Sequence, residues 1–347
     1  MKAWRDLPDA DPAHAHAETE AAIAAAGIDL DPPPPGFHRH GHELHESDHP
    51  HPHHQSEPGE RPIIGIIGAG AVGTALGVAL SRAGWPIQAV ASRDAGRRER
   101  FHALVEGARA FAEPQALLDE VELAIVAVPD DAIGPLAASL RMYSGQAMVH
   151  TSGALDADVL APAMAAGTQV GAFHPLVAFA DTERAVEALR GATIAIEGDD
   201  QLAGLLADMA EAIGARPARL APGSKAAYHA AAVLAAGGFV ALLDAIAELG
   251  RVAGLDEAGS LAIYGPLIEG TLGNARALGV RASLTGPIAR GDLGTLEAHL
   301  AALRTHAPDV LDLYRVVGER EVDLAVSRGS LAPERAADLR AALARVD

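Results

Sequence analysis

The chain has 347 residues, of which 49% are hydrophobic, and a formal net charge of -19 at pH 7. Such a negative charge argues against a nucleic-acid partner and against binding to an anionic membrane surface, because both require a basic face. Cysteine is absent, which excludes disulfides, thiolate catalysis and cysteine metal sites.

Two further patterns concern membranes. No apolar run in the sequence reaches the ~18 residues that a membrane span requires. The first residues also lack the charged, apolar and small-residue segments of a signal peptide. We therefore expect a cytoplasmic protein without a membrane span.

Residues 1–60 differ in composition from the rest of the chain. They hold ten of the 16 histidines, are rich in proline and lack apolar periodicity, which predicts a disordered tail. Clustered imidazoles bind zinc, nickel or copper weakly, although a solvated tail without bound metal fits the same composition better. We expect no metal site in the folded domains. The candidate ligands in the tail are His38, His40, His42, His45, His49, His51, His53 and His54.

From residue 61 onward, short apolar runs alternate with helical stretches, which is typical of a parallel sheet covered by helices on both faces. After about residue 221 the pattern changes to long amphipathic helices with breaks at glycine or proline. The fold class is therefore α/β. We expect a Rossmann-type, doubly wound and mostly parallel sheet in residues 61–221, followed by an all-helical domain in residues 222–347. The expected strands are 62–67, 86–92, 107–111, 122–129, 146–151, 170–175, 192–198 and 216–220.

A glycine-rich turn follows the first of these strands. Gly68, Gly70 and Gly73 form the pattern G-x-G-x-x-G between a strand and a helix. The first glycine permits a tight turn, the second lets the backbone approach a pyrophosphate, and the third lets helix and strand pack closely. The turn therefore predicts a dinucleotide site. Its residues are Gly68, Ala69, Gly70, Ala71, Val72 and Gly73.

The end of the second strand indicates which dinucleotide binds. Enzymes that use NAD place an acidic residue there, against the ribose 2′-hydroxyl. This chain has Ser92 and Arg93 instead, and Asp94 comes one or two positions late. A hydroxyl and a guanidinium suit a 2′-phosphate, so we expect NADP(H), although the arginines of this segment could also form a merely solvated face.

The next strand ends carry residues suited to a substrate site. Small hydroxyls beside a glycine turn can bind a carboxylate, and a histidine can move a proton to or from a hydroxyl or carbonyl group. A single histidine is more often structural, but two at strand ends beside a nicotinamide site favour catalysis. The fifth strand ends in Thr151, Ser152 and Gly153, and the sixth ends in His174 and Pro175. The fourth strand ends in Val128 and Pro129, where the chain must turn, and we expect these two residues to bind the cofactor beside its nicotinamide ribose.

The helical half begins with a lysine in an apolar, alanine-rich context. Lys225 and His229 are four residues apart and share a helix face, with Tyr228 beside them. Desolvation would lower the pKa of the lysine and make it a usable acid, whereas a lysine at a helix start could also extend into water.

A second segment of the helical half is LTGPIARGD, which contains Thr285 and Arg290. The glycine–proline break predicts a loop that closes over the cleft between two domains. Arg290 could pair there with a substrate carboxylate or simply with Asp292.

Together these motifs resemble a known family. The chain resembles a bacterial family of Rossmann-like oxidoreductases with a helical C-terminal domain of unknown function. That family belongs to the superfamily of 6-phosphogluconate dehydrogenase, ketopantoate reductase, pyrroline-5-carboxylate reductase and prephenate dehydrogenase. The resemblance extends from about residue 61 to the C-terminus. It is carried, in chain order, by GIIGAGAVGTALGVAL, AVPDDAI, HTSGAL, FHPL, KAAYHAAAV and LTGPIARGD.

The resemblance implies roles for single residues. Ketopantoate reductases carry K-x-x-x-N, in which the lysine donates a proton and the asparagine holds the substrate. Lys225 matches the lysine, but His229 replaces the asparagine, so either residue could be the donor. Prephenate dehydrogenases carry a catalytic serine and a catalytic histidine after successive strands. Ser152 and His174 resemble these, although the lysine that follows that serine is missing here.

We therefore expect an NADP-dependent oxidoreductase that transfers hydride between NADPH and a small carboxylate-bearing carbonyl substrate, first of all a ketopantoate-type 2-oxo acid. A prephenate-like or cyclic-imine oxidoreductase and a non-catalytic NADP-binding sensor are the alternatives. Superfamily members often dimerise through the helical domain, so we expect a homodimer. The candidate catalytic residues are Lys225, His229, His174 and Ser152, and the candidate substrate-binding residues are Thr151, Gly153, Pro175, Thr285 and Arg290.

Overall fold

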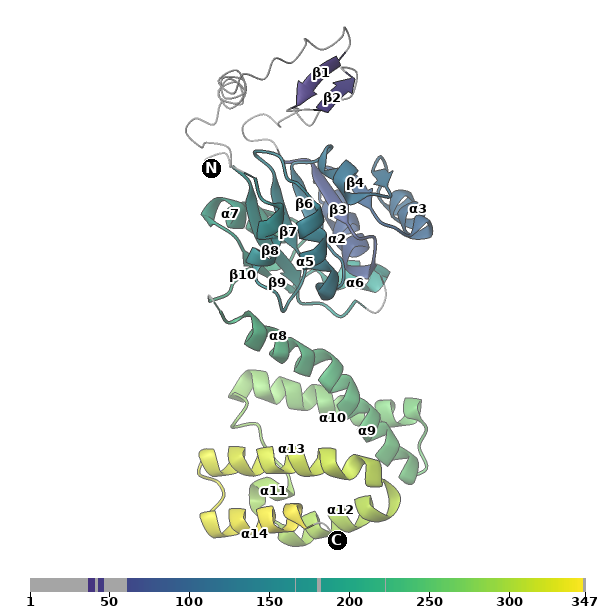
Figure 1. Cartoon of the computed structure of the whole chain (residues 1–347). Helices are drawn as coiled ribbons and strands as arrows, with labels where there is room; N and C mark the ends of the chain where they lie inside the picture. The colour runs from purple at the N-terminus through teal and green to yellow at the C-terminus, as the bar shows by residue number, and fades with distance from the viewer. Residues whose placement is uncertain are drawn as a thin grey trace. The chain divides into compact units, whose positions relative to one another are not determined.

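The computed structural model describes residues 37–40, 43–46, 61–165, 167–179, 182–221 and 223–345. It has two compact units, which divide between Ala232 and Val233. Figure 1 shows a sheet with helices on both faces in the first unit and only helices in the second.

The first unit contains all eight predicted strands. They form one sheet in the order β10-β9-β8-β7-β6-β3-β4-β5. Every neighbouring pair is parallel except β8 and β9, so the expectation of a mostly parallel Rossmann-type sheet is confirmed. The strands are β3 (Ile64–Ile67), β4 (Ile87–Ala91), β5 (Arg109–Phe111), β6 (Leu123–Val126), β7 (Ala147–His150), β8 (Gln169–Pro175), β9 (Thr193–Glu197) and β10 (Arg216–Arg219).

Alternation along each strand divides the core between the two faces of the sheet. Ile64 and Ile66 of β3 pack with residues of α2, α3, α6 and α7, whereas Ile67 packs with residues of α4, α5 and η1. Such two-sided burial explains why the strands consist almost entirely of apolar residues. The helices are α2 (Ala71–Arg82), α3 (Ala95–Leu104), α4 (Pro114–Leu118), α5 (Asp130–Ser139), η1 (Ala157–Ala163), α6 (Thr182–Ala188), α7 (Asp200–Ala212) and α8 (Lys225–Val233).

One row of residues crosses five neighbouring strands and locates the site. Ile67, Val126, His150, Ala172 and Glu197 are partners in successive strand pairs from β3 to β9. The glycine-rich turn follows the first of these residues directly. The row therefore aligns the end of β3 with the ends of β6, β7 and β9.

The second unit is entirely helical among its described residues, as expected. Its core is formed by α11 to α14, through residues such as Ile288, Leu300, Val322 and Leu339. The helices are η2 (Leu234–Gly238), α9 (Phe239–Val252), α10 (Glu257–Leu278), α11 (Pro287–Arg290), α12 (Leu293–His306), α13 (Pro308–Ser327) and α14 (Pro333–Ala344).

One helix bears on the expectation about membrane spans. Lys225–Val252 has 28 residues and contains an 18-residue window with a mean hydropathy of 2.1, so it is long and apolar enough to cross a membrane. A few polar residues interrupt the apolar run in the sequence, but the average over this window stays high. Length and composition alone are weak evidence for a span, because helices of other proteins have them too.

Two short strands lie within residues 1–60, the segment for which disorder stays a prediction. β1 (Phe37–His40) and β2 (Glu43–Glu46) pair in antiparallel fashion. Two short segments separated by two residues, the first a glycine, have the spacing of a β-hairpin. The rest of residues 1–60 and the side chains of all the candidate metal ligands lie outside the described residues.

Candidate functional site

The turn between β3 and α2 is built for close approach of an anion. Gly68 has a φ of 108°, and a Cβ on it would lie 2.3 Å from the Ala127 carbonyl oxygen. A Cβ on Gly73 would lie 2.0 Å from the carbonyl oxygen of Gly68. By contrast, no atom lies within 4 Å of the Cβ position of Gly70, the residue before α2. The first amides of α2 have no acceptor within the helix, so these residues fit the pyrophosphate of a dinucleotide.

At the end of β4, one arginine among the described residues, Arg93, is free to bind a phosphate. Asp94 caps α3 by accepting a hydrogen bond of 3.0 Å from the Arg97 amide, and it also pairs with the Arg97 side chain at 3.6 Å. Arg98 donates to the carbonyl oxygen of Ser92. Arg93 is exposed and has no polar partner within the part of the chain that the structure describes. Asp94 is thus engaged with its own helix, and Ser92 and Arg93 are the residues that could face a ribose phosphate.

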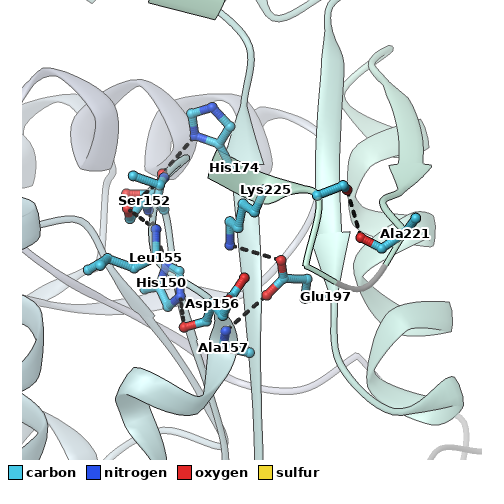
Figure 2. A network of polar contacts seen from close by, with 12 residues as sticks. His150, Ser152, Leu155, Asp156, Ala157, His174, Glu197, Ala221 and Lys225 are labelled. Atoms are coloured by element: carbon cyan, nitrogen blue, oxygen red, sulfur yellow. Dashed lines mark hydrogen bonds and ion pairs between the residues drawn. The ribbon is translucent and has the colours of Figure 1, made fainter. Parts of the chain in front are cut away.

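His150 shapes the loop that follows β7. It is fully buried, and its Nδ1 accepts a hydrogen bond of 3.1 Å from the Ser152 amide. Its Nε2 therefore carries the hydrogen and donates to the Asp156 carbonyl oxygen at 3.1 Å (Figure 2). Burial, followed by the positive charge of Lys225, lowers the pKa of His150 to about 4. With both nitrogens engaged, His150 is a structural residue.

Ser152 shapes the same loop. It is 5% exposed, and its hydroxyl oxygen accepts hydrogen bonds of 3.1 Å from the amides of Ala154 and Leu155. Only its hydroxyl hydrogen remains for a ligand. Thr151 lies next to it, and its carbonyl oxygen accepts a hydrogen bond of 2.9 Å from Nδ1 of His174.

Two histidines and a tyrosine converge beside Gly153. A Cβ on Gly153 would lie 2.6 Å from Nε2 of His174 and 2.3 Å from Nδ1 of His229. The His174 ring lies 5.8 Å from the His229 ring and 6.0 Å from the Tyr228 ring, both edge to face. Among the described residues, His229 Nδ1 and the Tyr228 hydroxyl are buried without a hydrogen-bond partner. Burial, above all other causes, lowers the pKa of His174 and raises that of Tyr228.

Lys225 lies deeper than these residues. Its side chain is 2% exposed, and its Nζ forms an ion pair of 3.2 Å with Oε1 of Glu197 (Figure 2). The other carboxylate oxygen of Glu197 accepts a hydrogen bond of 2.9 Å from the Ala157 amide. Burial lowers the pKa of Lys225, and the Glu197 carboxylate opposes this shift. Glu197 was missed at the sequence level, where its only signal was an acidic residue at the end of an apolar strand.

The structure thus brings Ser152, Gly153, His174, Lys225 and His229 together within the first unit. Pro175 ends β8 beside His174, and Val128 lies against the Gly68 turn, followed by Pro129 at the start of α5. Thr285 and Arg290 belong to the second unit and remain predictions. There the charge of Arg290 acts on Asp292, which caps α12 through Thr295.

The pKa of His150 predicts a pH-dependent stability. The unfolded chain takes up a proton near pH 6.5, whereas the folded chain takes it up only near pH 4. The contribution of His150 is therefore complete above pH 6.5 and is lost as the pH falls toward 4, by about 3 kcal/mol in total. Urea unfolding at several pH values measures the loss. In His150→Gln the free energy of unfolding should depend less steeply on pH, and equal slopes in the two proteins would contradict the assignment.

Comparisons with known families agree with this architecture. Residues 50–175 match the model of a Rossmann-like domain, and residues 192–321 match the model of the domain of unknown function DUF2520. The chain is a Rossmann-like protein with a DUF2520 domain. The family expected from the motifs is thereby confirmed, including its helical C-terminal domain of unknown function. No curated protein sequence matches the chain.

Solved structures are similar over most of the chain. A proposed NADP oxidoreductase from Bacteroides fragilis is 25% identical, with a TM-score of 0.64, over 75% of this chain and 98% of its own. A protein from Thermotoga maritima is 26% identical, with a TM-score of 0.59, over 77% of this chain and 99% of its own. The 1-pyrroline-5-carboxylate reductase of Streptococcus pyogenes is 17% identical, with a TM-score of 0.55, over 78% and 99%, and shares the fold.

Proposed function

We propose that this Rossmann-like DUF2520 protein is an NADP-dependent oxidoreductase that reduces a C=O or C=N carbon of a small metabolite. The observation that carries the proposal is that the glycine turn after β3 and the His174 cluster (His174, Tyr228 and His229) lie at the same edge of the sheet, with β6 and β7 between β3 and β8. The similarity to the proposed NADP oxidoreductase of Bacteroides fragilis supports it.

Different residues of the first unit would bind different parts of the cofactor. The turn at Gly68, Gly70 and Gly73 would bind the pyrophosphate, and Ser92 and Arg93 would bind the ribose 2′-phosphate. Val128 and Pro129 would border the nicotinamide ribose. When bound there, NADPH supplies the hydride.

The His174 cluster would handle the proton. Because Nδ1–H of His174 donates to Thr151, the neutral ring has its lone pair on Nε2, next to Gly153 and His229. Reduction adds hydride to carbon and a proton to the oxygen or nitrogen. We assign that proton to Nε2 of His174. In oxidation the Nε2 lone pair takes the proton from the substrate, and in reduction His174 first takes up a proton from solvent and then donates it from Nε2 of the imidazolium. Tyr228 and His229 would hydrogen-bond the same substrate atom.

Two substrate classes are compatible with this site. A ketopantoate-type 2-oxo acid needs a cation or several hydrogen-bond donors for its carboxylate, and the charge of Lys225 is already neutralised by Glu197. Thr151 and Ser152 could supply donors, and Arg290 remains the predicted cation. A cyclic imine needs no partner for a carboxylate, because the rings of His174, Tyr228 and His229 can hydrogen-bond its nitrogen.

The assay that decides is the loss of reduced-nicotinamide absorbance with ketopantoate, other 2-oxo acids and pyrroline-5-carboxylate. Turnover of one of them supports an oxidoreductase and identifies the class. NADPH binding without turnover of any member of a wide panel favours an NADP-binding sensor instead.

Arg93 should determine the preference for NADPH. Arg93→Gln should weaken NADPH binding by about tenfold or more and change NADH binding by less than about twofold, because only NADPH carries the 2′-phosphate. Fluorescence titration of the two nucleotides measures both affinities. Arg97→Gln is the matched control, since Arg97 is already engaged by Asp94. Equal losses for both nucleotides would contradict the role of Arg93.

We also propose that the protein forms a homodimer. The second unit exposes large apolar side chains, including Leu234 (73% exposed), Ile263 (57%) and Leu267 (67%). Apolar patches of this kind normally mark an interaction surface. A second copy would cover them, including Leu234 on the apolar helix Lys225–Val252. Light scattering of the purified protein measures the oligomeric state.

A further inference from the structure

Glu197 connects three segments that are far apart in the sequence. It ends β9, its Oε1 pairs with Nζ of Lys225 at 3.2 Å, and its Oε2 accepts a hydrogen bond of 2.9 Å from the Ala157 amide. Ala157 begins η1 and Lys225 begins α8. Figure 2 shows the carboxylate between these two groups.

Lys225 is buried next to its counter-charge. Its side chain is 2% exposed, and its Nζ lies 3.2 Å from Oε1 of Glu197. Among the described residues, Lys225 Nζ, the Tyr228 hydroxyl and His229 Nδ1 are all buried without a hydrogen-bond partner. The lysine has an ion pair, however, whereas Tyr228 and His229 have no charged partner and are the groups left to interact with a ligand.

The position of Lys225 on α8 indicates a role for the Lys225–Glu197 pair other than proton donation, namely to position neighbouring side chains. Residues three and four apart lie on the same face of a helix, so fixing Lys225 also fixes the turn that carries Tyr228 and His229. On the other side of the pair, Glu197 lies level with His150 and Ala172 in the row that crosses the sheet. The pair thus ties the first turn of α8 to the strand ends.

We infer that Glu197 and Lys225 are positioning residues, which together hold Tyr228 and His229 against His174. The proton at the substrate is therefore not delivered by Lys225. This inference rests on the proposed function for its kinetic test, but the placement of the rings can be tested without turnover.

A double-mutant comparison tests the pair. Glu197→Gln leaves a buried lysine without its counter-charge, so it should lower the Tm by about 5 to 10 °C and reduce kcat by about tenfold or more. Lys225→Met removes the charge but leaves the carboxylate unpaired. The double variant Lys225→Met with Glu197→Gln removes both charges and keeps an acceptor for the Ala157 amide. It should recover the Tm and retain at least about one tenth of the wild-type kcat.

A proton-donating lysine gives the opposite result. Lys225→Met and the double variant would then both lose about 100-fold or more in kcat, and in the double variant this loss would persist although the Tm and the NADPH affinity are recovered; that result would overturn the inference. The matched control is Arg190→Met. It removes an exposed ion pair of 3.9 Å with Glu187, and neither Tm nor kcat should change measurably.

Histidine NMR separates this inference from the proposed function. If the wild-type protein turns over no substrate, the proposed function fails, but the imidazole signals of His174 and His229 can still be followed. The single variants should shift both signals, and the double variant should restore them toward the wild-type positions. Unchanged signals in the single variants would show that the pair does not position the rings.

Discussion

Gly70→Asp should abolish NADPH binding and leave the fold intact. No atom lies within 4 Å of the Cβ position of Gly70, and its φ of -80° suits any residue. Aspartate is a favoured residue before a helix, so the Tm should stay the same or rise slightly. The new carboxylate would occupy the place that we assign to the pyrophosphate and would repel it. We expect the affinity for NADPH to fall by at least about 100-fold.

Three variants make this result interpretable. Gly70→Asn adds the same volume without charge and should lose less affinity than Gly70→Asp. Gly73→Ala should instead destabilise the protein, because its Cβ would lie 2.0 Å from the Gly68 carbonyl oxygen. Gly204→Ala adds a methyl group inside α7 where no atom lies within 4 Å, so it should leave the NADPH affinity unchanged and raise the Tm slightly. If Gly70→Asp binds NADPH as tightly as the wild type, the glycine turn is not the cofactor site. Thermal unfolding and fluorescence titration measure the two properties.

His174→Asn should reduce turnover by about 100-fold to 10,000-fold, because asparagine cannot carry the proton. Its amide can still donate to the Thr151 carbonyl oxygen, so the loop should keep its conformation. NADPH affinity should remain within about twofold, since the substituted ring lies outside the cofactor turn. Steady-state kinetics with the substrate found in the panel measures the loss.

His102→Asn provides the control. His102 is exposed on α3, and its Nδ1 also donates to a backbone carbonyl oxygen, that of Ala108, at 2.8 Å. It makes the same local contact away from the His174 cluster and should leave kcat unchanged. Burial lowers the pKa of His174, so in the oxidising direction activity should persist below pH 6.5 before it declines. Wild-type turnover in His174→Asn would exclude His174 from the proton transfer.

The sequence predicted the strands well because most of them are buried on both faces. All eight runs of apolar residues became strands, and the glycine turn lies where the pattern placed it. The reversal of β9 could not be predicted, since the direction of a strand depends on the path of the chain between strands. The spacing of Lys225, Tyr228 and His229 correctly placed them on one helix face.

The partner of the lysine could not be found in the same way. Glu197 is 28 residues before Lys225, and only the register of β8 and β9 brings it level with His150. From spacing alone, Lys225 matched the lysine of ketopantoate reductases. The structure adds the ion pair between Lys225 and Glu197. This pair is the reason why we infer a positioning role for Lys225 instead of proton donation to a substrate.

The π-helical turn Leu234–Gly238 interrupts the helix Lys225–Val252 shortly after His229. Such turns are rare and occur frequently at functional sites. The helix that carries Tyr228 and His229 therefore has a second feature typical of a functional site.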